Sequence, residues 1–508
     1  MTSTITSGLS ALQARLDTDD IPWQRTVILI GVGVAIFEGY IGHRQGPYLS
    51  SILSPTIPAA LAPYLPASTS QKTYHASQAY AKAKMSYGSV MSGLDQIETA
   101  LLLTGVLSPV YSALFGSNGV RGNWTLLKGF WDVSGRLLGS VGKSGEIKQS
   151  LVFVTIMTLI GTVLTTPKAY WKAFVLEEKH GFNKMTRHTF WVDQVKGVFL
   201  SLALEIPILA GILKIIHLVG RDGMLTVVAY LMLFIFSFQL VMIPLYPYLI
   251  APLFNKFTPL EESSPVYPLV SALSTKLGFP LGRVWVMDGS KRSSHSNAYF
   301  FGLPGLTKHI VIYDTLLTQA SPEEVEAILG TLRTFISASL WKILNTVSFS
   351  SAHELGHWSH FHVPILLLTS LFQTSVTLLT FTLFLSNAHL VSAFGFPSTS
   401  PPTIISLLLA ANVFQPLSAI LSFAMNSITR ILEYDADKFA AALGSSYAVS
   451  LKKALVRIHE ENLSIYGVDW IYSAYNHNHP TLCERLEALD GELEKSSSGS
   501  KGEAKKDL

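Results

Sequence analysis

The chain has 508 residues, of which 49% are hydrophobic and 14% are charged. Soluble domains carry about 25% charged residues, so this composition excludes an ordinary soluble protein and indicates a membrane protein. The formal net charge of +3 is too small to indicate a nucleic-acid partner. The single cysteine, Cys483, excludes an internal disulfide framework.

Seven segments are long and apolar enough to cross a bilayer, which takes about 20 residues in a helix. A buried core helix is the alternative for each, and it has most weight for the first and third segments, which are short and contain Gly or Thr. The sequence thus predicts an α-helical membrane protein. In chain order the segments are Arg25–Ile41, Gln96–Phe115, Ser150–Thr166, Lys196–Val219, Met224–Tyr248, Val363–Leu385 and Thr403–Ile428.

Two carboxylates, Glu38 and Glu205, fall inside these segments. An ionised group is costly in lipid, so we expect both to face the interior of the helix bundle or a water-filled cavity. The alternative is that each forms a structural pair between neighbouring helices.

The stretch Ala251–His362, between the fifth and sixth spans, is polar and mixes turns with short alternating runs. Arg283–Asp288 and His309–Asp314 alternate as β-strands do, which predicts a small sheet. An edge strand near the intervening segment Lys291–Phe300 is suited to pair with an extended peptide. A plain surface hairpin is the alternative.

Within this stretch lies an H-E-x-x-H sequence, from His353 to His357. Residues four apart share one face of a helix, so the two histidines can bind one zinc ion. Glu354, beside the first histidine, can take a proton from water at the metal. Because apolar spans flank the motif, the pattern favours a membrane-embedded metalloprotease.

A zinc site of this kind needs a third protein ligand and one open position. The best candidate is Glu433, which lies four residues before Asp437 and shares a helix face with it. One carboxylate can bind zinc while the other accepts a hydrogen bond from a ligand histidine. A solvated acidic helix start is the alternative, but two spans separate His357 from Glu433 and so return the chain to the same membrane side.

Other histidines compete for this third position. Two of them, His360 and His362, lie off the face of the motif or beyond the end of its helix. A histidine near zinc can hydrogen-bond a tetrahedral oxyanion, and an arginine such as Arg485 can clamp a carboxylate. A plain surface position is the alternative for a loop histidine before proline. The competing residues are His360, His362, His477 and His479.

Several motifs of this sequence together resemble those of one known family. Across nearly its whole length the chain resembles the type I CAAX prenyl proteases, integral-membrane zinc endopeptidases of the endoplasmic reticulum, and seven spans fit that family. The motifs that match are Glu177–Asn183, Ile250–Phe257, Ser296–Gly302, His353–Trp358, Glu433–Asp437, and His479–Pro480 with Glu484–Arg485.

The resemblance implies that seven transmembrane helices enclose a large water-filled chamber, capped by a zincin-type metalloprotease domain with a small β-sheet. It implies one Zn²⁺ per chain, bound by His353, His357 and Glu433. It assigns the general base and acid to Glu354, and it makes Asp437 a hydrogen-bonding partner of the metal ligands.

The resemblance also implies the substrate. Asn297 and His479 match groups near the scissile bond, and Arg485 matches a substrate-binding arginine. Members of the family remove the last three residues of prenylated proteins that end in Cys-aliphatic-aliphatic-X. Fungal members also trim a farnesylated mating-pheromone precursor nearer its N-terminus. We therefore expect prenylated proteins and the lipid bilayer as partners, and a monomer.

These features divide the chain into parts. Residues 1–250 form a membrane region with five helices, 251–362 a metalloprotease domain with the H-E-x-x-H helix, and 363–428 the sixth and seventh membrane helices. Residues 429–494 complete the protease domain with the third metal ligand. The tail 495–508, which is rich in Ser, Gly and Lys, is predicted to be disordered.

The distribution of Lys and Arg among the loops predicts the orientation of the chain in the membrane. The loop Pro167–Gly197 is rich in Lys and Arg, whereas Ser386–Pro402 has none, which puts the first loop in the cytosol. Alternating spans then place the protease domain and C-terminus in the cytosol and the N-terminus in the lumen, although Gly116–Lys148 is luminal despite several basic residues. The ending Lys505–Leu508 resembles a di-lysine retrieval signal, so we expect the endoplasmic reticulum membrane, and also the inner nuclear membrane.

One segment departs from the family. Thr331–Ala352 separates the acidic helix Pro322–Leu329 from the H-E-x-x-H motif, whereas the family joins the two almost directly. The segment is either a real insertion or a translated intron, and we favour the intron. Two rival functions follow: a translocon-clearing or scaffold factor whose zinc site the insertion breaks, and a membrane quality-control protease without prenyl preference.

Overall fold

The computed structural model describes residues 2–50, 57, 70–115, 123–139, 145–220, 223–264, 267, 281–295, 298–301, 308–319, 357, 359–442 and 444–503. Asn297, His353, Glu354 and the segment Thr331–Ala352 therefore lie outside the described residues.

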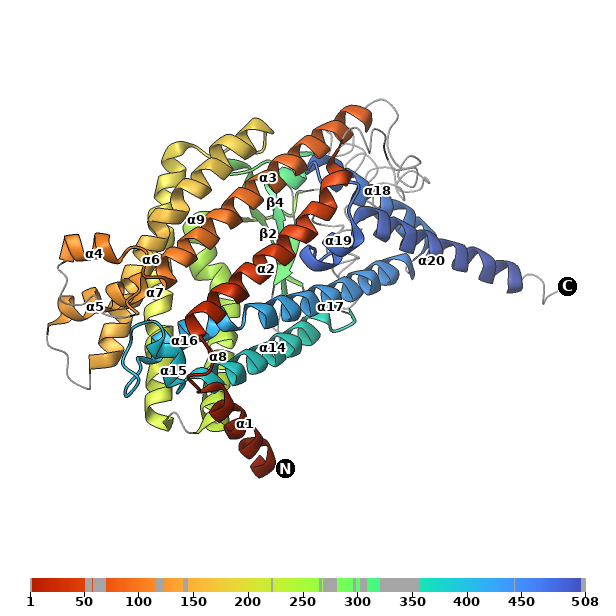
Figure 1. The fold of residues 1–508 in the computed structure, drawn as a ribbon. Coiled ribbons are helices and arrows are strands. Elements are labelled where there is room, and N and C mark those ends of the chain that lie inside the picture. Colours follow the sequence, from red (N-terminus) through yellow and green to blue (C-terminus); the bar gives the residue numbers. More distant parts are fainter. Residues whose placement is uncertain are drawn as a thin grey trace.

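Helices dominate the described fold (Figure 1). In the N-terminal half they are α1 (Thr2–Leu16), α2 (Trp23–Gln45), η1 (Gly46–Leu49), α3 (Ser70–Leu103), α4 (Ser108–Phe115), α5 (Leu126–Leu138), α6 (Glu146–Trp171), η3 (Lys172–Glu177), α7 (Arg187–Val219), α8 (Met224–Leu245), η4 (Tyr246–Ile250) and α9 (Ala251–Phe254). In the C-terminal half they are η5 (Gly289–Lys291), α11 (Asp314–Gln319), α14 (His362–Phe384), α15 (Ala388–Ser392), α16 (Thr403–Val413), α17 (Gln415–Ala442), α18 (Ser445–Glu461), α19 (Trp470–Asn476) and α20 (Leu482–Glu503).

Five stretches of helix are long and apolar enough to cross a membrane, and two bent helix pairs raise the number to seven. The seven predicted segments each fall on one of these candidates, so the predicted number of spans agrees with the structure. The five unbent candidates are Trp23–Leu49, Glu146–Glu177, Arg187–Val219, Met224–Met242 and Pro364–Phe384.

The second and seventh predicted spans are not single straight helices. The second is α3, which begins at Ser70 rather than Gln96, followed by α4 at an angle of 63°, and the seventh is α16 followed by α17 at 65°. Proline explains where the chain bends. Pro109 and Pro416 occupy the second position of α4 and α17 and cannot donate a backbone hydrogen bond to the preceding helix.

The membrane helices bury little of their surface against one another. In an apolar 18-residue stretch of each unbent candidate, only 6–17% is buried within the described protein. A helix in a solid bundle buries a continuous apolar stripe. The low share fits helices that face lipid on one side and an open interior on the other, which supports the predicted chamber.

The two carboxylates inside the spans each bind another helix. The Thr158 hydroxyl of α6 donates to Glu205 of α7 at 2.7 Å, and the Tyr475 hydroxyl of α19 donates to Glu38 of α2 at 3.2 Å. The interhelical pairing considered as an alternative is therefore present at both positions.

The sheet has four strands in the order β1-β2-β4-β3. They are β1 (Phe257–Pro259), β2 (Leu281–Met287), β3 (Ala298–Phe301) and β4 (Lys308–Tyr313). The two predicted strands are confirmed as β2 and β4, but these pair in parallel, so they do not form a hairpin with each other. Among the described strands β3 pairs only with β4, antiparallel, and so forms the edge of the sheet, directly after Asn297 in the sequence.

Loops on one side of the helices contact one another, and we call this side the far side. The Asn387 side chain, between α14 and α15, donates to the carbonyl of Leu16 at 2.9 Å. The Thr125 hydroxyl, at the start of α5, donates to the carbonyl of Phe394 at 3.1 Å. The far side thus joins the N-terminal segment to the loops after the second and sixth spans.

The opposite side, which we call the protease side, joins the remaining loops to the sheet and the C-terminal helices. Asn183, between the third and fourth spans, forms an isolated antiparallel bridge with Ser293. Arg44, at the end of the first span, pairs with Asp469 at 2.8 Å. This division of the loops into two groups agrees with seven alternating crossings.

The largest apolar cluster lies towards the far side. It joins α2, α5, α6, α14, α15 and α16, and includes the edge-to-face pair of Trp23 and Phe384, whose ring centroids are 5.6 Å apart. Phe153, Phe394 and Leu390 in this cluster are completely buried.

The C-terminal tail differs from the prediction. α20 continues to Glu503, so residues 495–503 are helical rather than disordered. Extending an existing helix costs little because the nucleus is already formed, and this outweighs the poor helix propensity of Ser and Gly. In Figure 1 the helix projects away from the rest of the protein towards the C-terminus.

Candidate metal centre and active site

Two carboxylates lie on the buried face of α17. Its buried positions Leu432, Glu433, Ala436, Asp437 and Ala440 recur at helical spacing, so they form one face. Glu433 is 4% exposed and Asp437 is 1% exposed. Burial of an ionised carboxylate is costly unless other groups pair with it, so the partners of these two residues define the site.

Glu433 is surrounded by groups from three segments. Nε2 of His357 lies 3.3 Å from its Oε1, and Nδ1 of His479 lies 3.0 Å from its Oε2. The Arg485 guanidinium lies 3.6 Å from the same Oε2. The predicted site residues His357, Glu433 and His479 therefore meet, although more than 120 residues of sequence separate the first from the last.

Asp437 binds the arginine. Arg485 donates from Nε to Oδ2 at 2.8 Å and from its terminal nitrogen to Oδ1 at 2.6 Å, a two-pronged pairing that fixes both groups. The role expected for Asp437 was to accept a hydrogen bond from a ligand histidine. Among the described residues both of its oxygens accept from Arg485, and its expected role towards a ligand histidine stays a prediction.

A capping box holds Arg485 in the first turn of α20. The amide and hydroxyl of Thr481 both donate to Glu484, and the amide of Glu484 donates to the Thr481 hydroxyl. Arg430 of α17 pairs with Glu484 at 2.8 Å and donates to the carbonyl of His479 at 3.3 Å. These contacts tie the loop that carries His479 to the helix that carries Glu433.

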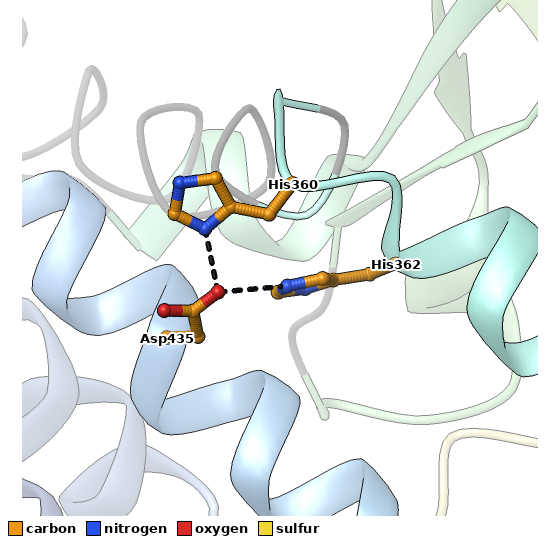
Figure 2. Close-up of side chains that lie close together, drawn as sticks. All are labelled: His360, His362 and Asp435. Carbon is orange, nitrogen blue, oxygen red and sulfur yellow. Dashed lines mark hydrogen bonds and ion pairs between the residues drawn. The ribbon is translucent and has the colours of Figure 1, made fainter.

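The histidines beyond the motif lie beside the site rather than far from it. Nδ1 of His362 is 2.7 Å from Nδ1 of His357. Oδ2 of Asp435 lies 3.2 Å from Nε2 of His362 and 2.6 Å from Nδ1 of His360 (Figure 2). Burial lowers the pKa of His362, and Asp435 offsets this only in part. His477 instead packs edge-to-face against the ring of Tyr472.

Sequence reasoning set His360 and His362 aside and did not consider Asp435. His362 begins α14, after the end of the motif, so helical spacing does not place it near His357. A turn with Phe361 in the left-handed region, at a φ of 57°, brings it back. Asp435 lies between Glu433 and Asp437 but on another face of α17, and only the position of His362 gives it a role.

The described residues fit a metal ion. An imidazole nitrogen and a carboxylate oxygen are the donors that zinc prefers. In a tetrahedral site with bonds of about 2.0–2.1 Å, neighbouring donor atoms lie about 3.3 Å apart. The separation of 3.3 Å between Nε2 of His357 and Oε1 of Glu433 matches that edge.

Two family models cover most of the chain. The model described as the CAAX prenyl protease N-terminal domain with five membrane helices matches residues 51–256. The model of peptidase family M48 matches residues 263–330 and 333–493, which include every described site residue. The break between its two segments falls at the start of Thr331–Ala352.

Curated relatives agree along the whole length. CAAX prenyl protease 1 of Saccharomyces cerevisiae is 33% identical over 502 residues, covering 95% of this chain and 99% of the relative. The chain belongs to the CAAX prenyl protease 1 family. The homologue from Arabidopsis thaliana is 35% identical over 94% of this chain and 99% of its own length.

A solved structure supports the fold of this family member. The crystal structure of Ste24p from S. mikatae matches with a TM-score of 0.75 and 32% identity, covering 92% of this chain and 99% of that one. The predicted family, fold class and enzyme class are thereby confirmed. The protein is a multi-pass membrane metalloendopeptidase, and its family implies a metal.

Proposed function

We propose that this protein is a zinc-dependent endopeptidase that removes the last three residues of prenylated proteins ending in Cys-aliphatic-aliphatic-X. If it is a fungal member, a farnesylated pheromone precursor is a second substrate. The convergence of His357 and His479 on the buried carboxylate of Glu433 carries the proposal. The names of the relatives, which are CAAX prenyl proteases along nearly the full chain, support the substrate class.

The metal in this proposal is one Zn²⁺ held by His353, His357 and Glu433. When bound, zinc supplies Lewis acidity towards the scissile carbonyl and towards water. Glu354 takes a proton from the attacking water and returns it to the leaving amine. Glu354 is next to His353 in the sequence, so a helix over the H-E-x-x-H motif would present the base beside the ligands.

The remaining residues position the peptide. His479, whose ring is more than half exposed beside Glu433, donates a hydrogen bond to the oxyanion that forms at the scissile carbonyl. Asn297 directly precedes the edge strand β3, so a substrate strand that pairs with β3 passes it. Arg485 orients the site through Asp437 and adds positive charge towards the substrate carboxylate.

An apolar groove supports a lipid-bearing substrate. A cavity of about 690 Å³ lies between α2, α17 and α19, and its lining includes Phe37, Ile420, Phe423 and Trp470. Tyr475 also lines the groove, and it lies four residues before His479 in the sequence. The prenylated cysteine is adjacent to the scissile bond, so its lipid must lie near the site, and this groove has the matching apolar surface.

The location proposed is the endoplasmic reticulum membrane, with the protease side in the cytosol and the far side in the lumen; the inner nuclear membrane is continuous with it. The basic loop between the third and fourth spans lies on the protease side, as the positive-inside rule requires. The oligomeric state proposed is a monomer.

The test is cleavage of a farnesylated peptide by the full-length protein in detergent, with the metal content measured in parallel. Glu354→Gln keeps the ligands and should retain zinc, but should cut about 10²–10⁴-fold more slowly because the proton carrier is lost. Full activity in this variant would contradict the metalloprotease mechanism. Equal cleavage of the unprenylated peptide by the natural protein would indicate a general membrane protease instead.

A further inference from the structure

A chain of hydrogen bonds leads away from the metal ligand His357. Its Nε2 faces Glu433, and its Nδ1 lies 2.7 Å from Nδ1 of His362. Nε2 of His362 lies 3.2 Å from Oδ2 of Asp435. Each ring thus uses one nitrogen towards the site and the other away from it, as Figure 2 shows for the outer end of the chain.

With neutral rings and a metal between His357 and Glu433, these contacts fix where each proton lies. The Asp435 carboxylate only accepts, so Nε2 of His362 carries the proton and donates. A neutral imidazole carries one proton, so Nδ1 of His362 accepts, and Nδ1 of His357 must donate to it. Nε2 of His357 is then left with its lone pair, pointed at Glu433, where a metal ligand needs it.

Burial makes this arrangement effective. His362 is 1% exposed, so water does not compete for its nitrogens. The turn before it holds Phe361 at a φ of 57°, in the left-handed region that residues with a side chain rarely adopt. Strain of this kind persists where the surroundings require a particular geometry. Here it places His362 directly behind the ligand.

We propose that His362 and Asp435 are positioning residues that hold His357 as the Nδ1–H tautomer and aim its Nε2 at the metal. This proposal rests on the proposed metal centre. Partners of this type commonly orient metal-binding histidines, and their loss costs about 10–100-fold in metal affinity. His362 lies where it can fix the tautomer of His357, while the carboxylate of Asp437 binds Arg485.

A second metal site made of His360, His362 and Asp435 is the rival interpretation, because their donor atoms lie within 4.8 Å of one another. The distances favour hydrogen bonds. The 2.6 Å between Nδ1 of His360 and Oδ2 of Asp435 is well below the edge of about 3.3 Å expected between two zinc ligands. A single carboxylate oxygen accepts from both rings.

The test measures zinc affinity of the full-length protein by competition with a chelator, without substrate. His362→Leu should weaken zinc binding about 10–100-fold. His362→Asn places an amide oxygen near the position of Nδ1 and should recover most of the affinity, which a merely structural role would not predict. His360→Ala is the matched control: it contacts the same Asp435 oxygen but not His357, and should change affinity less than twofold.

Three results would overturn the proposal: unchanged affinity in His362→Leu, an equal loss in His360→Ala, or a second zinc per chain that both variants lose. The thermal midpoint of each variant shows whether it is folded, and the visible spectrum of the Co²⁺-loaded protein reports the ligand field directly. Failure of the proposed substrate would appear only in the peptide assay, so the two proposals fail separately.

Discussion

Among the described residues, the buried charged side chains lie on the protease side, whereas the far side buries only apolar and uncharged polar ones. The far-side cluster buries aromatic and aliphatic side chains such as Phe153 and Phe394, and its loops are joined by hydrogen bonds to backbone carbonyls. The protease side buries Glu433 and Asp437, whose partners come from segments far apart in the chain. The far side thus stabilises the helix arrangement, and the protease side uses that stability to hold charges in a reactive geometry.

The largest effect should come from removing the carboxylate at the centre of the protease side. Glu433→Ala deletes a metal ligand, so zinc content and peptide cleavage should both fall, by more than the about 10–100-fold that partners of ligands contribute. Metal analysis and the farnesyl-peptide assay measure this. Glu492→Ala, in the same C-terminal region but paired with Lys495, is the control and should keep both. Retained zinc in Glu433→Ala would contradict the ligand assignment.

A substitution that creates a cavity on the far side should lower stability and leave the metal site unchanged. Phe394 is completely buried, so Phe394→Ala should destabilise the protein by about 3–5 kcal/mol. Zinc content and KM should stay unchanged at a temperature where the variant is folded, because the site lies on the other side. Thermal unfolding in detergent measures the loss. Phe372→Ala, at a position that is 66% exposed on α14, should change stability little.

The protease side should also be the acid-sensitive side. Nε2 of His459 in α18 is shielded from solvent, and burial lowers the pKa of this histidine from 6.5 to about 4. The unfolded chain therefore binds a proton at pH 5 and the folded protein does not, so stability is lost as the pH falls from about 6.5 to about 4. The full shift corresponds to about 3 kcal/mol.

Replacing this residue isolates its contribution. His459→Phe keeps an aromatic ring against Tyr466, with which His459 packs at a centroid distance of 4.6 Å. The thermal midpoint of the variant should fall less between pH 7 and pH 4.5 than that of the natural protein. Parallel pH profiles for the two proteins would show that other groups cause the acid sensitivity.

The groove between α2, α17 and α19 offers a smaller effect. Ile420→Trp narrows it and should raise KM for a farnesylated peptide about tenfold, or about 1.4 kcal/mol. Ile431→Trp is matched in helix and exposure, at 65% against 63%, but does not line the groove. An equal effect of both substitutions on KM would indicate a general disturbance of α17 rather than lost lipid contacts.

The smallest effect concerns the segment Thr331–Ala352, which lies outside the described residues. A zinc helix that restarts just before His353 leaves this ligand in a frayed first turn. Deleting the segment should therefore raise zinc occupancy, and activity several-fold. Equal values in the two proteins would show that the segment is a tolerated natural loop, and sequencing the transcript across residues 329–353 would decide whether it is an intron.

Local sequence patterns predicted most of the helices and strands. Runs of apolar residues located all seven spans because a bilayer imposes a length and a polarity on each, and alternation located β2 and β4 because strands have a period of two. The parallel pairing of those strands, the bends at Pro109 and Pro416, and the helical end of the chain were not predictable in the same way. They depend on contacts or on helix propagation, which local composition does not express.

The candidate site, too, was predictable only where it depends on local spacing in the sequence. Spacing in the sequence was enough to predict that His353 and His357 share a helix face, and that Glu433 and Asp437 do. Residues one helical turn apart share a face whatever surrounds them. Which partner each side chain meets was decided only by the tertiary structure. Arg485 took the carboxylate of Asp437, and a strained turn at Phe361 brought His362 behind His357. Hydrogen bonds between segments depend on how helices pack against one another, and that packing is a property of the whole chain rather than of any motif.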